Sequence, residues 1–542
     1  MQAQLRNAIY NTSVYDWSLR GSVPERLRGI PPEPLSAVLS GNSNAGREIL
    51  NGNYNLLGHA HHLGDLPWRN TRLSEQQIRI LHRFEFLADL KSFGTDDAAD
   101  KGRELMTRWI NDFGRWRVDA WRPEVTGGRL VNWLRTFDFL HNKDHPGFEM
   151  TFLESCAVQI RHLSRSIEDT PPDQQAVEAA EGLILGAICL NGMETVLENG
   201  LAALEIALER QILADGGHFQ RNPTVQYQVL LRLVRIRDTL SAAQLDVPHT
   251  LQVTIDRMVP MLRAYRHTDG RLALFNGSTE GNDEAINQLL KKSGTKARSL
   301  SNAPHTGFQR AETKHSALIT DAGAAVVSGA NLGAHAGLLS FEFSHKNHRL
   351  IVNCGASADR DDNWHTALRA TAAHSTVCVN DTNALEVRES GELGVIDTHV
   401  TSRRSESDGS TFLQMRHDGY RKLFGLVHAR DIYISAAGDD LRGCDTLKLM
   451  MDYMGSHAKD FAVRFHLHPE ISAELSGNKK SAILKVSNRE GWRFRCSGGD
   501  LSIEESVYLG IQHRKRRTSQ LVISGLVNQQ DVEVKWSLIK EG

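Results

Sequence analysis

The turn that decides the fold assignment reads Asp215-Gly-Gly-His-Phe-Gln-Arg-Asn-Pro-Thr-Val-Gln-Tyr227. Its two glycines and its proline interrupt a helical pattern, which resumes directly after the proline. The segment therefore brings His218, Arg221, Asn222 and the phenol of Tyr227 onto a single turn that enters a helix. A turn of this kind can direct several polar groups toward one ligand.

Amphipathic helices are expected on both sides of this turn. Ser74-Glu-Gln-Gln77 predicts a capping box at the start of a long helical region. Apolar residues then recur at steps of three and four, before the turn at positions 197, 201, 204, 208 and 212 and after it at 225, 229, 233, 236 and 240. Such helices, paired across Gly, Pro or Asn turns, predict an α/α-hairpin toroid.

The pattern changes to short β-rich runs near residue 310. Ser340-Phe-Glu-Phe-Ser alternates apolar and polar residues, and Arg349-Leu-Ile-Val-Asn and Ser375-Thr-Val-Cys-Val lie between turn residues. We therefore predict an α+β multidomain chain with three parts. These are an irregular N-terminal cover over residues 1–70, the toroid over 71–310, and a C-terminal antiparallel β-sandwich over 311–542.

Composition limits the classes of ligand. The chain has 542 residues, and 63 Lys and Arg side chains nearly balance 65 Asp and Glu. This balance excludes the global positive field of a nucleic-acid-binding protein, so an anionic ligand would need a local cluster of arginines. The six cysteines form no CxxC pair and are expected to be buried, reduced thiols.

We find neither a membrane-spanning stretch nor a secretory signal in the sequence. No apolar stretch approaches the roughly 18 residues of a membrane span, and Met1-Gln-Ala-Gln-Leu-Arg-Asn-Ala lacks the apolar core of a secretory signal. A cytoplasmic protein is the expectation from these features alone.

Two segments of the β-rich part carry histidines that we expect on neighbouring strands. Gly333-Ala-His-Ala-Gly-Leu-Leu-Ser-Phe contains His335, and Arg369-Ala-Thr-Ala-Ala-His-Ser-Thr contains His374. Together with the Asp215 turn, these segments resemble the heparinase II/III family of polysaccharide lyases, from roughly residue 70 to the C-terminus. The resemblance implies the toroid and β-sandwich fold, β-elimination on a uronate-containing glycan, and a place in the cell envelope or periplasm.

A uronate lyase must remove the proton next to a carboxylate, which requires a base, an acid and a group that neutralises the carboxylate. In the family, the tyrosine two residues after the proline of the turn is catalytic, but Val225 stands there in this chain. The nearest phenol is Tyr227, rotated by about 200° on a helix. Tyr227 is either the catalytic phenol or a packed helix residue.

The resemblance also suggests which residues touch substrate. His218 and Arg221, with Asn222 beside them, are expected to line the cleft, unless His218 bonds a carbonyl and Arg221 pairs with a carboxylate to fasten the helix. The family neutraliser precedes Gly182-Leu-Ile-Leu-Gly, where Gln174 or Gln175 would replace it. Arg369, which opens the last motif, is also expected to bind substrate.

A metal site is the open question of the resemblance. Two family histidines and an aspartate can hold a metal, and the matching positions here are His335, His374 and Asn353. Two imidazoles and an amide bind a divalent metal poorly compared with two imidazoles and a carboxylate. No cofactor is expected to be required, a structural zinc stays open, and both histidines are alternatively acids or substrate contacts in the cleft.

Three functions remain after this reasoning. The first is a lyase acting on an anionic glycan, with no nucleic-acid partner and an undetermined oligomeric state. The second is a carbohydrate-binding protein that kept the fold and lost turnover. The third is a toroid glycoside hydrolase, which would need a pair of carboxylates, and Asp215, Asp269 and Glu280 are available for that role.

Overall fold

The chain forms two compact units, as seen in a computed structural model that describes residues 2–21, 27, 29, 31, 41–142, 146–324, 333–360, 362–388, 392–394, 398–450, 459–487, 490–511 and 514–541. Unit 1 comprises Met1–Gln211, Val229–Ile255 and Lys291–Gly294. Unit 2 comprises Ile212–Gln228, Asp256–Leu290 and Thr295–Gly542. This division differs from the predicted ranges, because residues 1–70 belong with the helices and the Asp215 turn belongs with the sheets.

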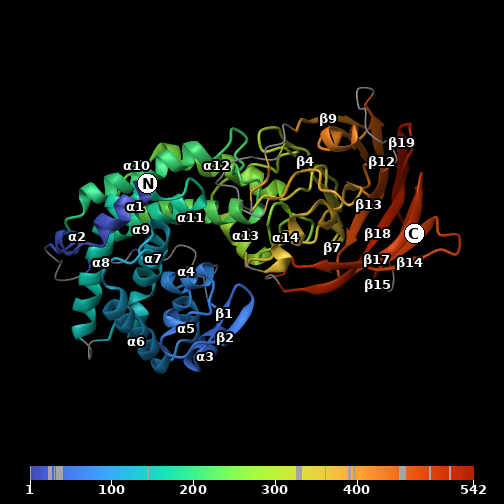
Figure 1. The fold of residues 1–542 in the computed structure, drawn as a ribbon. Helices are drawn as coiled ribbons and strands as arrows, with labels where there is room; N and C mark the ends of the chain where they lie inside the picture. The colour runs from blue at the N-terminus through green and yellow to red at the C-terminus, as the bar shows by residue number, and fades with distance from the viewer. Residues whose placement is uncertain are drawn as a thin grey trace. The chain divides into compact units, whose positions relative to one another are not determined.

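The described residues of unit 1 are helical, apart from one hairpin near the N-terminus (Figure 1). Its elements are α1 (Gln2–Tyr10), α2 (Ser13–Leu19), α3 (Ser43–Leu50), β1 (Asn53–Leu56), β2 (His59–His62), η1 (Pro67–Arg69), α4 (Glu75–Arg83), α5 (Leu87–Phe93), α6 (Asp96–Phe113), α7 (Pro123–Leu140), α8 (Pro146–Ser166), η2 (Ile167–Asp169), α9 (Gln174–Cys189) and α10 (Glu194–Gln211). The described part of the predicted N-terminal cover thus includes regular helices and a hairpin.

Local sequence signals explain how these helices begin and pack. The capping box predicted at Ser74 is confirmed, because the Ser74 side chain accepts from the Gln77 backbone while the Gln77 side chain accepts from the Ser74 backbone. The helix ends at Arg83, and its C-cap residue Phe84 takes a left-handed φ of 58°. Helices α7 and α9 approach closely at Gly127 and Gly182, where an added Cβ atom on either glycine would overlap the other helix.

Three helices have residues in both units. They are α11 (Pro223–Ala242), α12 (His249–Ala264) and α13 (Asp283–Lys292). The α11 helix confirms the apolar stripe that begins at Val225, since Val229, Leu233 and Leu240 are fully buried.

Unit 2 contains two antiparallel sheets, drawn as the yellow to red strands of Figure 1. One sheet has the order β14-β15-β16-β19-β12-β11-β10-β9, and the other has the order β17-β18-β13-β7-β6-β5-β4-β3 with β8 paired to β13. The strands of the unit are β3 (Asn302–Ala303), β4 (Phe308–Glu312), β5 (Ser316–Asp321), β6 (Phe341–His345), β7 (His348–Val352), β8 (Val377–Val379), β9 (Val400–Ser407), β10 (Ser410–His417), β11 (Leu426–Ile434), β12 (Asp440–Leu449), β13 (Lys459–Leu467), β14 (Ser472–Leu475), β15 (Ser481–Ser487), β16 (Glu490–Ser497), β17 (Asp500–Tyr508), β18 (Arg516–Val527) and β19 (Val532–Lys540). Short helices α14 (Asn363–Arg369), η3 (Thr371–Ala373) and α15 (Arg421–Phe424) connect them.

The two sheets face one another across an aromatic core, which confirms the predicted sandwich. Trp536 of β19 stacks on Phe341 of β6 with ring centroids 5.4 Å apart, and Phe465 of β13 lies 5.1 Å from both Trp536 and Phe494. The sandwich therefore holds the loops between its strands on a packed, rigid base.

One expectation for this unit is wrong. His335 and His374 do not lie on strands, since His335 belongs to the loop before β6 and His374 directly follows η3. The apolar runs that suggested strands begin only after each histidine.

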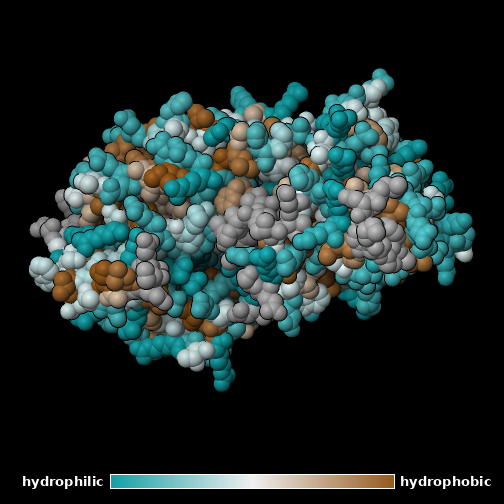
Figure 2. Space-filling model, turned by 45° about the horizontal axis from the view of Figure 1, so that its top comes forward, coloured by the Kyte–Doolittle hydropathy of each residue, from teal (hydrophilic) through white to brown (hydrophobic). Residues whose placement is uncertain are grey.

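The surface is mostly hydrophilic on the face drawn in Figure 2, with apolar side chains in small scattered patches. Among the described residues, no helix is both long and apolar enough to cross a bilayer. All six cysteines are free, as expected, although Cys444 and Cys496 are only partly buried.

Buried histidines predict a loss of stability at mildly acidic pH. Burial lowers the pKa from 6.5 to about 3 for His82, His218 and His466 and to about 4 for His162 and His374. Between pH 6.5 and these lowered pKa values, the unfolded chain therefore binds protons at histidines that stay neutral in the folded chain. The free energy of unfolding is highest above pH 6.5 and falls as the pH drops from 6.5 toward 3–4. We expect the urea midpoint to begin falling near pH 6.5, and a midpoint constant down to the carboxylate range near pH 4 would contradict this.

Candidate functional site

The Asp215 turn is fastened to the β-rich part of unit 2 by its own side chains. Asp215 accepts hydrogen bonds from the backbone of His305 at 2.9 Å and of Thr306 at 2.7 Å, and from the Thr306 hydroxyl. Gly217 packs against the Thr306 side chain so closely that an added Cβ atom would overlap it. The glycines of the motif are thus needed for this close approach.

Arg221 is buried and makes its contacts within unit 2. Its Nε donates to the carbonyl of Thr306 at 2.7 Å, its Nη1 donates to the carbonyl of Ala324 at 3.0 Å, and its Nη2 pairs with Asp321. The guanidinium also lies 5.1 Å from the ring centre of Phe308. This geometry matches the structural alternative for Arg221, pairing with a carboxylate, and its contact with substrate stays a prediction.

His218 is also deeply buried. Its Nδ1 accepts from the backbone of Gln220 at 3.2 Å, and its own backbone donates to the Gln226 side chain at 2.7 Å. Because burial lowers its pKa to about 3, the imidazole is neutral at pH 7. Like Arg221, it shapes the turn, and its role toward a substrate is untested.

Asn222 caps helix α11. Its Oδ1 accepts from the backbone of Thr224 at 2.8 Å and of Val225 at 3.1 Å, and its Nδ2 donates to the carbonyl of Asn276 at 2.7 Å. The valine at the family tyrosine position therefore lies in the first turn of the helix, with 8% of its surface exposed.

Asn276 joins the turn to the loop that carries His335. It donates to the carbonyl of Arg221 at 3.1 Å and accepts from the backbone of His335 at 3.2 Å. The turn and His335 thus belong to one hydrogen-bonded assembly within unit 2. Sequence reasoning did not find Asn276, because nothing in its local sequence distinguishes it from an ordinary turn asparagine.

His335 and His374 form a hydrogen-bonded pair. His335 Nδ1 lies 3.1 Å from His374 Nε2, and His374 Nδ1 lies 2.8 Å from the carbonyl oxygen of Ala370. Because a carbonyl oxygen can only accept, His374 Nδ1 carries the proton and donates to Ala370. The unprotonated Nε2 of His374 then accepts a hydrogen bond from His335, so His335 carries its proton on Nδ1. His335 Nε2 is therefore an unprotonated nitrogen.

Gly277 lies near His335 Nε2 and carries no side chain. A Cβ atom at Gly277 would lie 3.8 Å from His335 Nε2 and 3.3 Å from Asn222 Nδ2. Burial, with the neighbouring His374 ring and the charge of Arg369, holds the pKa of His335 well below its usual value, so the ring is neutral at pH 7. The unprotonated Nε2 of a neutral imidazole can accept a proton, and the lowered pKa makes it a weak base.

Arg369 brackets the same loop. Its Nε donates to the carbonyl of Ala334 at 2.9 Å, and its carbonyl accepts from the backbone of Ala336 at 2.9 Å. The side chain is 1% exposed, and its Nη2 is buried without a hydrogen-bond partner among the described residues. No carboxylate of the described chain forms an ion pair with it, which leaves a buried cation beside His335.

Tyr227 lies one helical turn into α11, and burial raises its pKa to about 12. A phenol that acts as a base needs a pKa closer to the operating pH. The raised pKa works against a catalytic role for Tyr227, and that role stays a prediction.

Gln174 and Gln175 lie at the start of α9 in unit 1. Gln175 Nε2 donates to Asp173 at 3.0 Å, and the backbone of Gln175 donates to the same carboxylate, which caps the helix. Gln174 Oε1 is buried without a partner among the described residues. The other candidate residues belong to unit 2.

The donor set does not fit a zinc site. The amide oxygen of Asn353 accepts from the backbone of Ser375 at 3.0 Å, and its amide nitrogen donates to the carbonyl of Leu274 at 3.1 Å. His335 and His374 bond to each other. In the described part of the chain, no group of three or more His, Cys, Asp or Glu side chains is arranged to hold a metal.

We expect the purified protein to carry substoichiometric zinc and to keep its Tm in the presence of a chelator. Asn353→Asp should not restore binding, because it places a carboxylate oxygen against the Leu274 carbonyl. Elemental analysis and thermal melts check both variants. One zinc per chain in the wild type would show that an unrecognised ligand completes the site.

The carboxylates considered for a hydrolase are engaged in the scaffold. Asp269 pairs with Arg349 at 2.9 Å, Glu280 pairs with Arg271 at 2.8 Å, and Asp215 holds the turn. The largest single effect on Asp269 and Glu280 is burial, which favours a higher pKa. Hydrogen bonds and arginine charges together exceed this effect, so the pKa of both carboxyl groups lies below its usual value. A glycosidase acid needs a raised pKa.

A buried ion pair in the sandwich supports both histidine segments. Arg430 Nη1 donates to the carbonyls of Leu339 at 2.9 Å and Ser375 at 2.8 Å, and its Nε donates to Asp445 at 2.6 Å. Both charged side chains are buried. This support was not foreseen, since an arginine on an alternating strand is usually expected to face solvent.

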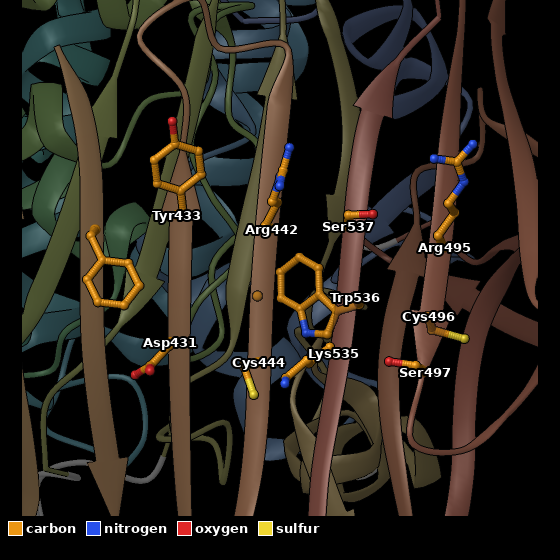
Figure 3. A pocket seen from close by; sticks show the side chains of 12 residues that line it. Asp431, Tyr433, Arg442, Cys444, Arg495, Cys496, Ser497, Lys535, Trp536 and Ser537 are labelled. Atoms are coloured by element: carbon orange, nitrogen blue, oxygen red, sulfur yellow. The ribbon is translucent and has the colours of Figure 1, made fainter. Parts of the chain in front are cut away.

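A shallow cavity of about 480 Å³ opens elsewhere in unit 2, on the outer face of the eight-stranded sheet (Figure 3). Tyr433 and Arg442 project from the adjacent strands β11 and β12, and Arg495 projects from β16, on the other side of β19. At its floor, Gly443 lacks the side chain that would overlap the indole of Trp536. The cavity shares no residue with the His335 assembly.

Comparison with known proteins agrees with this architecture. The sequence profile described as "Heparinase II/III-like, C-terminal" matches residues 295–537. The chain is 31% identical over 543 residues to FtsZ-localized protein C of Caulobacter vibrioides, an alignment that covers 96% of this chain and 93% of that protein.

Solved structures show the same fold. Heparinase III superposes with a TM-score of 0.73 at 12% identity, covering 99% of this chain and 89% of that one. A heparan sulfate lyase mutant from Pedobacter heparinus superposes with a TM-score of 0.64 at 15% identity, covering 99% and 88%. The chain belongs to the heparinase II/III-like family.

Proposed function

We propose that the protein is a polysaccharide or oligosaccharide lyase that cleaves a uronate-containing glycan of the cell envelope by β-elimination. The observation that supports this most is the buried guanidinium of Arg369, which lacks a carboxylate partner among the described residues and donates to the carbonyl of Ala334, the residue before His335. A cation and a base are the two groups that proton removal next to a carboxylate requires.

In this proposal Arg369 pairs with the substrate carboxylate and makes the adjacent proton more acidic. His335 Nε2 takes that proton, and the electron pair left on the carbon forms the carbon–carbon double bond. The glycosidic carbon–oxygen bond breaks, and the leaving oxygen takes the proton back from the His335 imidazolium, which returns to its neutral form. His374 holds His335 in the required tautomer through the 3.1 Å hydrogen bond. His218, Arg221 and Asn222 shape the cleft wall, and Tyr227 is the alternative acid or base.

The test is incubation with a panel of uronate polymers, followed by the ultraviolet absorbance of the unsaturated sugar. Appearance of that absorbance supports the lyase. Shorter chains without the absorbance would mean hydrolysis, and binding without any product would favour a carbohydrate-binding protein on the same fold.

A second candidate is a non-catalytic role at FtsZ. It is favoured by the 31% identity, over nearly the whole chain, to a protein named for its localisation with FtsZ. Valine at the family tyrosine position and asparagine at Asn353 are consistent with lost turnover. Co-sedimentation with purified FtsZ polymers tests this role, and no enrichment in the pellet over a protein-only control would contradict it.

A further inference from the structure

Unit 2 contains a strongly basic cavity that the proposed catalytic residues do not share. Its volume is about 790 Å³, within the range of small-molecule and oligosaccharide sites. Its walls come from the end of α12 and the turn after it, the segment before β3, strand β4, and the turns β4–β5 and β6–β7. The cationic side chains that line it are Arg263, Arg266, Arg298, Arg310, Lys314 and Lys346.

The lining of this cavity is far more positively charged than the chain as a whole. Six arginine or lysine side chains line it with one carboxylate, Glu312, whereas the whole chain has a net charge of -2. Arg263, Arg298 and Lys314 form no ion pair within the described residues. This is the local cationic cluster that a nearly neutral chain needs to hold an anion.

Two arginines in the wall, Arg266 and Arg310, are held in place by hydrogen bonds. Arg310 is 6% exposed and donates to the carbonyls of Ala264 at 3.2 Å and Arg266 at 2.5 Å. Arg266 donates to the carbonyl of Gly270 at 2.7 Å and to Asn287 at 2.6 Å. Guanidinium groups fixed in this way lose little freedom when an anion binds.

Among the described residues, two buried donors at this wall have no hydrogen-bond partner. Arg263 Nε and the Thr268 hydroxyl are buried without a hydrogen bond among the described residues. Burial and the charges of Arg263 and Arg310 also lower the pKa of Arg266, which records that like charges crowd together here. An anion in the cavity would satisfy the donors and relieve the repulsion.

We propose that this cavity binds the sulfate or carboxylate groups of an anionic glycan, at a place separate from His335. The choice of a glycan rests on the proposed lyase function. Guanidinium groups pair with sulfate and carboxylate oxygens in a bidentate manner. The lining has no Phe, Tyr or Trp, so single-stranded nucleic acid would lack the aromatic platforms on which its bases stack.

The experiment measures binding of a heparin fragment by calorimetry at low salt in a His335→Ala background, which separates binding from turnover. The test variant is Arg263→Ala with Arg298→Ala, chosen because neither side chain has a carboxylate partner that its removal would strand. The matched control is Arg257→Ala with Arg403→Ala, two exposed arginines outside the cavity, one on the same helix. We expect roughly a tenfold or greater loss of affinity in the test variant alone.

Three further ligands decide the class of the anion. Hyaluronan carries carboxylates without sulfates, so the ratio of its affinity to that of heparin separates the two groups. Equal or tighter binding of poly-L-glutamate or of a thymidine oligonucleotide would overturn the glycan assignment. Unchanged heparin affinity in the test variant would overturn the site itself.

Failure of this inference is distinct from failure of the lyase function. Wild-type protein that binds heparin through Arg263 and Arg298 but releases no unsaturated product from any polymer would contradict the lyase alone. Product release with unchanged binding in the test variant would contradict the cavity alone.

Discussion

Replacing His335 by glutamine is expected to lower the turnover of a uronate polymer by roughly 10²- to 10⁴-fold, the contribution typical of a general base. The reason is the tautomer chain from the Ala370 carbonyl through His374, which leaves His335 Nε2 free to accept a proton. Glutamine keeps a donor for His374 but has no basic nitrogen. The measurement is the initial rate of ultraviolet absorbance with protein concentration matched by folded fraction.

His399→Gln is the matched control, since this histidine is 74% exposed and lies outside the assembly. Tyr227→Phe should leave the rate nearly unchanged if the phenol only packs. A large loss in Tyr227→Phe with an active His335→Gln variant would reverse the assignment of the base. Because the pKa of His335 is held low, the wild-type rate should stay level across neutral pH and fall only in acid.

Replacing Arg221 by methionine is expected to destabilise unit 2 by about 3–5 kcal/mol, the usual cost of leaving one member of a buried ion pair uncompensated. Both Arg221 and Asp321 are about 4–5% exposed, so little solvent screens the stranded carboxylate. The variant also loses the hydrogen bonds to Thr306 and Ala324. Urea unfolding followed by fluorescence measures the effect, with midpoints compared because two units need not unfold as one.

Arg221→Met combined with Asp321→Leu should recover much of this loss, since no charge then remains buried. Arg403→Met, at an exposed position on β9, should leave the midpoint within about 0.5 kcal/mol of the wild type. A stable Arg221→Met variant that fails to bind glycan would instead assign Arg221 to the substrate.

The fold could be predicted from the apolar periodicity of the sequence and from its turn and capping residues. The Ser74 capping box, the α11 stripe and the alternation around Phe341 each describe local structure, and each appears where it was predicted. The unit boundary did not follow. The Asp215 turn joins the sheets because Asp215 and Arg221 bond to residues about one hundred positions away, which no local pattern records.

The site was predictable only in part, for the same reason. Sequence motifs selected His335, His374 and Arg369, and these three lie together. Their chemistry depends on partners that motifs do not name, such as the Ala370 carbonyl that sets the tautomer. Whether an arginine is paired, as Arg221 is, or lacks a carboxylate, as Arg369 does, is decided by distant carboxylates.

Arg430 has a consequence for how this scaffold changes over evolutionary time. Its guanidinium donates to the main-chain carbonyls of Leu339 and Ser375, one in each histidine segment. These hydrogen bonds do not depend on which side chains occupy positions 335 and 374. Substitutions there are expected to alter reactivity while the loops keep their course. Such a protein can lose one catalytic activity, remain folded without activity, and later gain another activity through a few substitutions.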